Sequence, residues 1–264
     1  MTLTDLLAAA SGTLVGLILG LVGGGGSILA VPLLVYVVGV GSTHIAIGTS
    51  AIAVAGSALA NLVPHWQAGH IKWRCALVFS AAGVAGAVSG STLGKLIDGQ
   101  QLLALFGLLM LIVGGMMLAG RGGAGDAGVR LTLGTARRLM PRLVMIGFAV
   151  GALSGLFGIG GGFLIVPGLM LATGMPLGYA VGTSLVAVFA FGAATAANYA
   201  ISGLVDWRLA LVFVGGGAVG GVAGAALGKL LSKGKNRLRL VFASIVIAVG
   251  LWTIWRSLLA LGVA

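Results

Sequence analysis

Long apolar segments separated by short polar stretches run through the whole chain. Each half of the 264 residues contains about five of them. They fall near 5–21, 27–39, 45–63, 74–94 and 102–119, and then near 142–157, 163–173, 179–200, 208–229 and 238–259. A helix of about 20 apolar residues crosses the hydrocarbon core of a bilayer. The pattern therefore predicts an all-α, polytopic membrane protein.

The second segment of each half is too short to cross a bilayer. Twelve helical residues rise only ~18 Å, whereas the hydrocarbon core is ~30 Å thick. A glycine-rich run precedes each short segment, at 23–26 and at 158–162. We therefore expect 27–39 and 163–173 to be half-helices or re-entrant arms that follow a break in the backbone.

The two halves are copies of one unit. GLILGLVGGGGSILAVP at 16–32 returns as GALSGLFGIGGGFLIVP at 151–167, an offset of 135 residues. At an offset of 134, Gly-Thr-Ser at 48–50 returns at 182–184, and a Trp-Arg pair returns as well. Duplication of this kind is typical of secondary transporters. We expect a first repeat over 1–119, a linker over 120–141 and a second repeat over 142–264.

The composition excludes the other broad classes of protein. Residues of the set AVILMFWYC make up 59% of the chain and charged residues only 7%, against about 25% in soluble domains. Disorder needs low hydrophobicity, and collagen needs a three-residue glycine period that the 49 glycines lack. The formal charge of +11 fits the basic cytoplasmic loops of membrane proteins better than a nucleic-acid partner. We expect a lipid bilayer around the chain and no nucleic acid.

The basic residues predict an orientation. Segments 120–142 and 229–239 are rich in Lys and Arg and should be cytoplasmic, together with the loop at 64–73. The loop at 95–101 should then face outward, which gives the two halves opposite orientations. Each short segment and the helix before it should then form either a hairpin or two full crossings, and both termini should lie on the non-cytoplasmic side.

The glycine-rich breaks are candidates for binding an anion. Apolar segments carry almost no charged residue near their middle, which argues against a carboxylate-based cation or proton site. The free N–H groups and positive dipole end of a short helix form an anion site without a charged side chain. Two such ends from inverted halves can converge near the midplane. The alternative is that these glycines only permit close helix packing.

Neutral polar side chains near the breaks extend the candidate site. The Thr-Ser pairs can cap a helix, join two helices or donate to a ligand, and the two asparagines can bind an oxyanion or a neighbouring helix. The full candidate set is Gly24, Gly25, Gly26, Ser27, Thr49, Ser50, Asn61, Gly160, Gly161, Gly162, Thr183, Ser184 and Asn198. The mismatches between the halves, such as Ser27 against Gly162, predict an asymmetric site.

Other glycines have a different role. In the fourth segment of each half, glycines recur at four-residue spacing, from Gly86 to Gly94 and from Gly216 to Gly228. This small-xxx-small pattern lets helix backbones approach closely, so we assign these glycines to packing.

No motif indicates an enzyme, a metal or a cofactor. The stretch from Gly90 to Leu96 resembles a P-loop but lacks the spacing and the hydroxyl residue after Lys95. Three scattered histidines and the single Cys75 make no metal or redox motif. We therefore expect no enzymatic activity, no metal and no cofactor.

The two glycine-rich motifs, each followed by a Gly-Thr-Ser and a Trp-Arg, resemble the TauE/SafE family of sulfite exporters and probable membrane transporter proteins. The resemblance covers about residues 8–256. It implies a multi-pass transporter of the bacterial inner membrane for sulfur-containing anions such as sulfite, sulfoacetate or other organosulfonates. The motifs of the family fall on the glycine-rich breaks and the Gly-Thr-Ser motifs, which are the positions of the candidate site above.

Two hypotheses follow from the sequence. In the first, a secondary transporter moves a small sulfur-containing anion, in the export direction, by rocking one half against the other. In the second, the chain is an anion channel or the membrane subunit of a larger transport complex. A homo-oligomer is compatible with both hypotheses.

Overall fold

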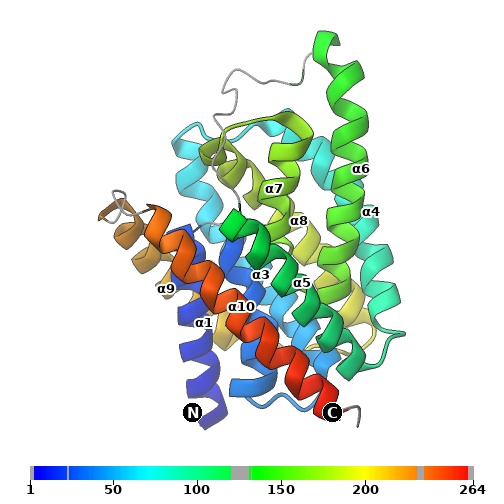
Figure 1. The fold of residues 1–264 in the computed structure, drawn as a ribbon, viewed down its shortest axis with the longest axis vertical. Coiled ribbons are helices and arrows are strands. Elements are labelled where there is room, and N and C mark those ends of the chain that lie inside the picture. Colours follow the sequence, from blue (N-terminus) through cyan, green and yellow to red (C-terminus); the bar gives the residue numbers. More distant parts are fainter. Residues whose placement is uncertain (1–2, 23, 120–130, 132, 231–234, 261–264) are drawn as a thin grey trace.

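The computed structural model describes residues 3–22, 24–119, 131, 133–230 and 235–260. Throughout this part of the chain the structure is helical, without strands, which confirms the predicted all-α fold (Figure 1). The first half contains α1 (Leu3–Val22), η1 (Gly24–Leu29), α2 (Ala30–Pro32), η2 (Leu33–Val37), α3 (Thr43–Gln67), α4 (Trp73–Gly94) and α5 (Gly99–Ala119). The second half contains α6 (Leu133–Phe157), α7 (Gly162–Thr173), α8 (Leu177–Ile201), α9 (Trp207–Leu230) and α10 (Lys235–Ala260).

Eight of the described helices are long and apolar enough to cross a membrane, and two shorter apolar segments are Gly26–Val37 and Gly162–Thr173. Most helices begin and end within a few residues of the apolar segments. The largest difference is α6, which begins at Leu133 although its apolar segment begins near 142. Its first turns carry exposed arginines such as Arg137 and Arg138, so a helix that continues into the polar region is invisible to hydropathy.

Each short segment folds back along the helix before it. A β-carbon at Gly161 would contact Ser154, and one at Gly168 would contact Val150 and Ile146, so α7 runs antiparallel to α6. In the first half, Gly26 lies against α1 at Val15 and Leu19 in the same way. Of the two expected arrangements, the hairpin is therefore present in both halves.

Helices of one half pack mainly on helices of the other half. Helix α1 packs on α9 of the second half, and α4 packs on α6 (Figure 1). Glycines bring these backbones into direct contact: a β-carbon at Gly16 would overlap with Gly217, and one at Gly90 would overlap with the carbonyl of Ala152. The glycines of the fourth segments thus pack as expected, and the seams they form join one half to the other.

The remaining pairs also follow a reciprocal pattern. Helix α3 packs on α8, α5 packs on α10, α3 also contacts α9, and α4 also contacts α8. The N-terminal turn of α3 lies beside the end of α8, since a β-carbon at Gly48 would meet Tyr199 and Leu204. The equivalent helices α3 and α8, and likewise α5 and α10, run antiparallel to each other, which is compatible with two repeats of opposite orientation.

The charged residues are divided between the two ends of the bundle. Both described chain ends lie at one end of the molecule, which we call the termini end, and the opposite end, which carries the start of α6, we call the linker end (Figure 1). The Arg74 guanidinium donates to the carbonyl of Leu131, which joins the start of α4 to the linker end. At the termini end, Asp5 pairs with Arg208 at 2.7 Å.

Candidate functional site

The second glycine-rich break is a tight turn between α6 and α7. Gly158, Gly160 and Gly161 have φ values of +65°, +61° and +69°. Residues with a β-carbon rarely adopt this left-handed conformation, so glycine is required at all three positions. The turn is also enclosed: Gly158 lies against Ile47 of α3, and Gly160 lies against Val54 of α3. The break is therefore held at the interface between the two halves.

The N-terminus of α7 is buried and uncapped. Gly161 is its N-cap and offers no side chain, and the carbonyl of Gly161 already accepts the N–H groups of Leu164 and Ile165. Among the described residues, the N–H groups of Gly160, Gly161, Gly162 and Phe163 make no hydrogen bond. Buried N–H groups in proteins are almost always paired, because an unpaired one costs free energy. This end of α7 therefore presents several donors without an acceptor.

A hydroxyl without a partner lies beside these donors. Ser154 of α6 is fully buried, and its Oγ has no hydrogen-bond partner in the described part of the chain. A β-carbon at Gly161 would stand 2.8 Å from that Oγ, so the hydroxyl lies directly against the N-cap of α7. Backbone donors, a helix dipole and a free hydroxyl thus converge at one buried point, which is the arrangement that an anion requires.

The first break has a different geometry. Gly24, Gly25, Gly26 and Ser27 all belong to the 3₁₀ helix η1, which continues through α2 into the π-helical turn η2. The expected start of a regular short α-helix is absent there. Gly26 packs on α1, and Ser27 is fully buried. Since η1 packs against α7, the two breaks do lie together, as a 3₁₀ segment beside an α-helical N-terminus.

The Gly-Thr-Ser motifs join the two halves. The Thr49 hydroxyl accepts the backbone N–H of Asp206 at 3.0 Å, and the Thr183 hydroxyl accepts that of Lys72 at 3.1 Å. Asp206 and Lys72 are themselves equivalent positions at an offset of 134 residues. Of the alternatives that the sequence left open for the threonines, the structure shows hydrogen bonds between helices.

The serines of these motifs are also engaged. The Ser50 hydroxyl lies between the carbonyl oxygens of Ile47, at 2.8 Å, and Gly158, at 3.0 Å, and so connects α3 to the second break. The Ser184 hydroxyl donates to the carbonyl of Val181 on its own helix. All four hydroxyl residues of the two motifs are fully buried.

The two asparagines lie away from the breaks. Asn61 donates to the carbonyl of Ser57 on its own helix. Asn198 accepts the ammonium of Lys95 at 2.9 Å and donates to Thr92 at 3.0 Å, near the ends of α4 and α8. The structure therefore brings Ser50 to the second break and η1 onto α7, and it leaves the asparagines outside this group.

Sequence reasoning missed Ser154. At the offset of 135, its counterpart in the first half is Leu19. The signal that could have identified it is a polar residue in one repeat where the equivalent position of the other repeat is apolar. Lys95 was also read as part of a surface loop, although its ammonium is held by Asn198 and, at 2.9 Å, by Ser202.

Within the described residues, no group of three or more His, Cys, Asp or Glu side chains stands close enough to hold a metal ion.

Comparison with known proteins gives a consistent result. Residues 8–253 match the family model described as Sulfite exporter TauE/SafE. A probable membrane transporter protein of Xylella fastidiosa (strain 9a5c) is 52% identical over 258 residues, which cover 97% of this chain and 98% of that protein. The probable membrane transporter protein YunE of Bacillus subtilis (strain 168) is 27% identical over 267 residues, covering 94% and 96%. No solved structure matches the chain.

Proposed function

The chain belongs to the sulfite exporter TauE/SafE family of membrane transporters, and we propose that it is a secondary transporter that exports a small sulfur-containing anion, such as sulfite or an organosulfonate. The bacterial inner membrane is the proposed location, with the linker end in the cytoplasm. Among the described residues, the basic Lys72, Arg74, Arg137, Arg138 and Arg142 belong to that end. The termini end has both basic residues, Lys95, Arg208 and Arg256, and the acidic Asp5, Asp98 and Asp206. This asymmetry agrees with the preference for basic residues on the cytoplasmic side.

The observation that carries the proposal is the buried N-terminus of α7. Its N–H groups at Gly160, Gly161 and Gly162 have no acceptor among the described residues, and the Ser154 hydroxyl beside them has none either. A bound sulfonate or sulfite oxygen accepts from such donors, and the helix dipole favours its negative charge. We place the anion at this point, between α7 and η1.

The remaining members of the sequence-based set have supporting positions in this proposal. Gly24, Gly25, Gly26 and Ser27 belong to η1, which packs against α7, and Ser50 holds the second break in place through the Gly158 carbonyl. Thr49, Thr183, Ser184, Asn61 and Asn198 already bond within the protein. We propose that these five residues position helices, and that the anion is held by the breaks and Ser154.

Reciprocal packing decides which units move during alternating access. The seams between α1 and α9 and between α4 and α6 are close backbone contacts, so separating one sequence half from the other would break both. We propose that α1, α3 and α9 form one rigid unit and that α4, α6 and α8 form the other. Each unit contains helices of both repeats, and the two units meet where α3 contacts α8.

A flux assay tests the proposed function. Purified protein is reconstituted into liposomes, and the liposomes are loaded with sulfite, sulfate, thiosulfate or sulfoacetate. Efflux of the anion is followed with and without a proton gradient. We expect saturable flux of at least one sulfur-containing anion and no single-channel current in planar bilayers. Absence of flux for all four anions, or unitary currents with ohmic conductance, would reject the proposal, and currents would favour the channel.

A further inference from the structure

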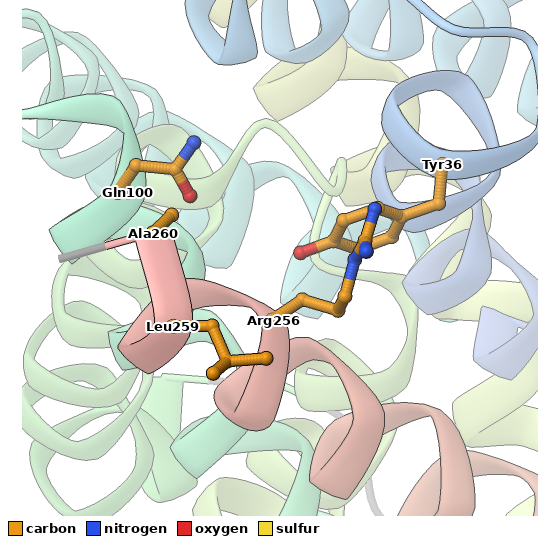
Figure 2. Close-up of a pocket in the computed structure, with 5 residues that line it drawn as sticks. All are labelled: Tyr36, Gln100, Arg256, Leu259 and Ala260. Atoms are coloured by element: carbon orange, nitrogen blue, oxygen red, sulfur yellow. The ribbon is translucent and has the colours of Figure 1, made fainter. Parts of the chain in front are cut away.

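A polar pocket, open on one side, lies at the termini end. Its volume is about 370 Å³, and it is bordered by η2, the start of α5 and the end of α10. The residues that line it are Tyr36, Gln100, Arg256, Leu259 and Ala260 (Figure 2). None of these residues belongs to the proposed binding site at the breaks.

The polar groups of this pocket include a cation without a counter-ion among the described residues. The Arg256 guanidinium stands 6.0 Å from the ring centre of Tyr36 and 6.0 Å from that of Trp252, and it makes no ion pair with a described carboxylate. The buried hydroxyls of Tyr36 and Ser257 lie close to each other, and neither bonds to any other described residue. Figure 2 shows the Tyr36 ring beside the guanidinium, with the Gln100 amide across the pocket.

The nearby carboxylate has another role. Asp98 lies two residues before Gln100, and its side chain accepts the N–H groups of Gln100, at 2.9 Å, and Gln101, at 3.4 Å. It therefore caps the first turn of α5, where the helix dipole stabilises its charge. The charge of Arg256 remains unmatched by this contact.

We propose that this cavity, here called the Arg256 pocket, is an oxyanion-binding site at the non-cytoplasmic mouth of the protein. A planar guanidinium binds two oxygens of a sulfonate, sulfite or phosphate group at once, and a phenol and an amide NH₂ supply further donors. The identification of the ligand as the transported sulfur-containing anion rests on the proposed function. The oxyanion chemistry of the pocket does not.

The pocket lies at the level where an anion in solution and a lipid headgroup can both reach it. Trp252 and Trp255 of α10 are 57% and 68% exposed, as aromatic residues at a membrane–water interface are. Tyr36 belongs to the same apolar segment, Gly26–Val37, that begins in the first break. Ten helical residues rise by about 15 Å, so this segment connects the mouth to the region of the proposed central site.

Binding is measured first, in a non-ionic detergent without phospholipid. Sulfite and inorganic phosphate are titrated separately. Binding is followed by calorimetric heat and by tryptophan fluorescence, to which Trp252 beside the guanidinium contributes. We expect Arg256→Gln to weaken binding about tenfold, because a charge-assisted hydrogen bond is lost, and Tyr36→Phe to weaken it less. The matched control is Arg138→Gln, an exposed arginine of α6 at the linker end, which should leave the affinity unchanged.

The proposal is overturned if Arg256→Gln binds every ligand as tightly as the wild type, or if the wild type binds none of sulfite, inorganic phosphate and short-chain phosphatidylglycerol. A short-chain phosphatidylglycerol titrated into the same samples distinguishes the source of the ligand. Arg256-dependent binding of this lipid alone identifies the oxyanion as a lipid phosphate, and Arg256-dependent binding of sulfite identifies it as the cargo.

A transport assay distinguishes a failure of the Arg256 pocket proposal from a failure of the proposed function. With anion supplied at the termini end of oriented proteoliposomes, Arg256→Gln should raise the half-saturating concentration about tenfold. A wild type that moves no sulfur-containing anion rejects the proposed function, and the detergent titration still decides the pocket.

Discussion

The Thr49 hydroxyl of α3 accepts the backbone N–H of Asp206, 157 residues further along the chain, at a distance of 3.0 Å. The equivalent bond of the other repeat joins Thr183 to Lys72 at 3.1 Å. Both threonines are fully buried, and each N–H donor lies where the polypeptide enters the fourth helix of the opposite half. The neighbouring glycines permit the approach, since a β-carbon at Gly182 would stand 2.6 Å from the carbonyl oxygen of His70. The Gly-Thr-Ser motif is thus a connection between the repeats.

Replacing Thr49 with Val should destabilise the protein. The change keeps the shape but leaves the N–H of Asp206 unpaired in a buried position, which costs about 1–3 kcal/mol. We expect a lower melting temperature in detergent for Thr49→Val and for Thr183→Val, and partial recovery in Thr49→Ser. Ser89→Ala is the control, because Ser89 is exposed and bonds within its own helix at 2.9 Å. Equal melting temperatures for Thr49→Val and Ser89→Ala would contradict this role.

The glycine seam between α4 and α6 should not tolerate a single methyl group. A β-carbon at Gly90 would overlap with the backbone of Ala152, so Gly90→Ala must separate the helices at a cost of about 1–3 kcal/mol. Gly115 of α5 has nothing within 4 Å of its β-carbon position. Gly115→Ala should therefore be neutral or slightly stabilising, as alanine is a better helix former. Size-exclusion profiles and melting temperatures of the two variants test the difference, and equal behaviour would argue against tight packing.

Removing the Ser154 hydroxyl should weaken transport without weakening the fold. In the unliganded protein this buried hydroxyl has no partner among the described residues, so Ser154→Ala loses no protein hydrogen bond. If the hydroxyl donates to the anion, the half-saturating concentration should rise by about five- to thirtyfold, the equivalent of ~1–2 kcal/mol. Ser89→Ala, at an exposed serine of α4, is the control. Wild-type transport kinetics in Ser154→Ala would remove this residue from the site.

Two engineered disulfides should distinguish the moving interface from the rigid one. In a Cys75→Ala background, Ala55→Cys with Gly192→Cys joins α3 to α8, where the β-carbons would stand 3.1 Å apart. Gly56→Cys with Val214→Cys joins α3 to α9, with 3.9 Å between the β-carbons, within one proposed unit. We expect oxidation to stop flux only in the first pair and reduction to restore it. Full flux through an oxidised α3–α8 pair would show that this interface does not open.

Much of the fold was predictable because hydrophobic segments of about 20 residues have few alternatives inside a bilayer. The period of the glycines in α4 and α9 likewise identified packing faces, and the short length of 163–173 predicted a half-helix or re-entrant arm. The geometry of the first break was not predictable. Gly24–Leu29 and 158–161 are both rich in glycine, yet the first forms a 3₁₀ helix and the second a left-handed turn. Local sequence does not distinguish these outcomes, since neighbouring helices decide which one fits.

By itself, the sequence determined the duplicated all-helical architecture, the two interrupted short segments and the near absence of charge in the spans. Periodicity, length and composition carry that information directly. Only the tertiary structure decided that each half packs on the other, and that Thr49 and Thr183 bond to backbone N–H groups across the repeats. It alone placed Ser154 beside uncapped N–H groups and Arg256 beside Tyr36. The physical reason is that a hydrogen-bond donor becomes available to a ligand only when folding leaves it without another partner, and that depends on residues distant in sequence.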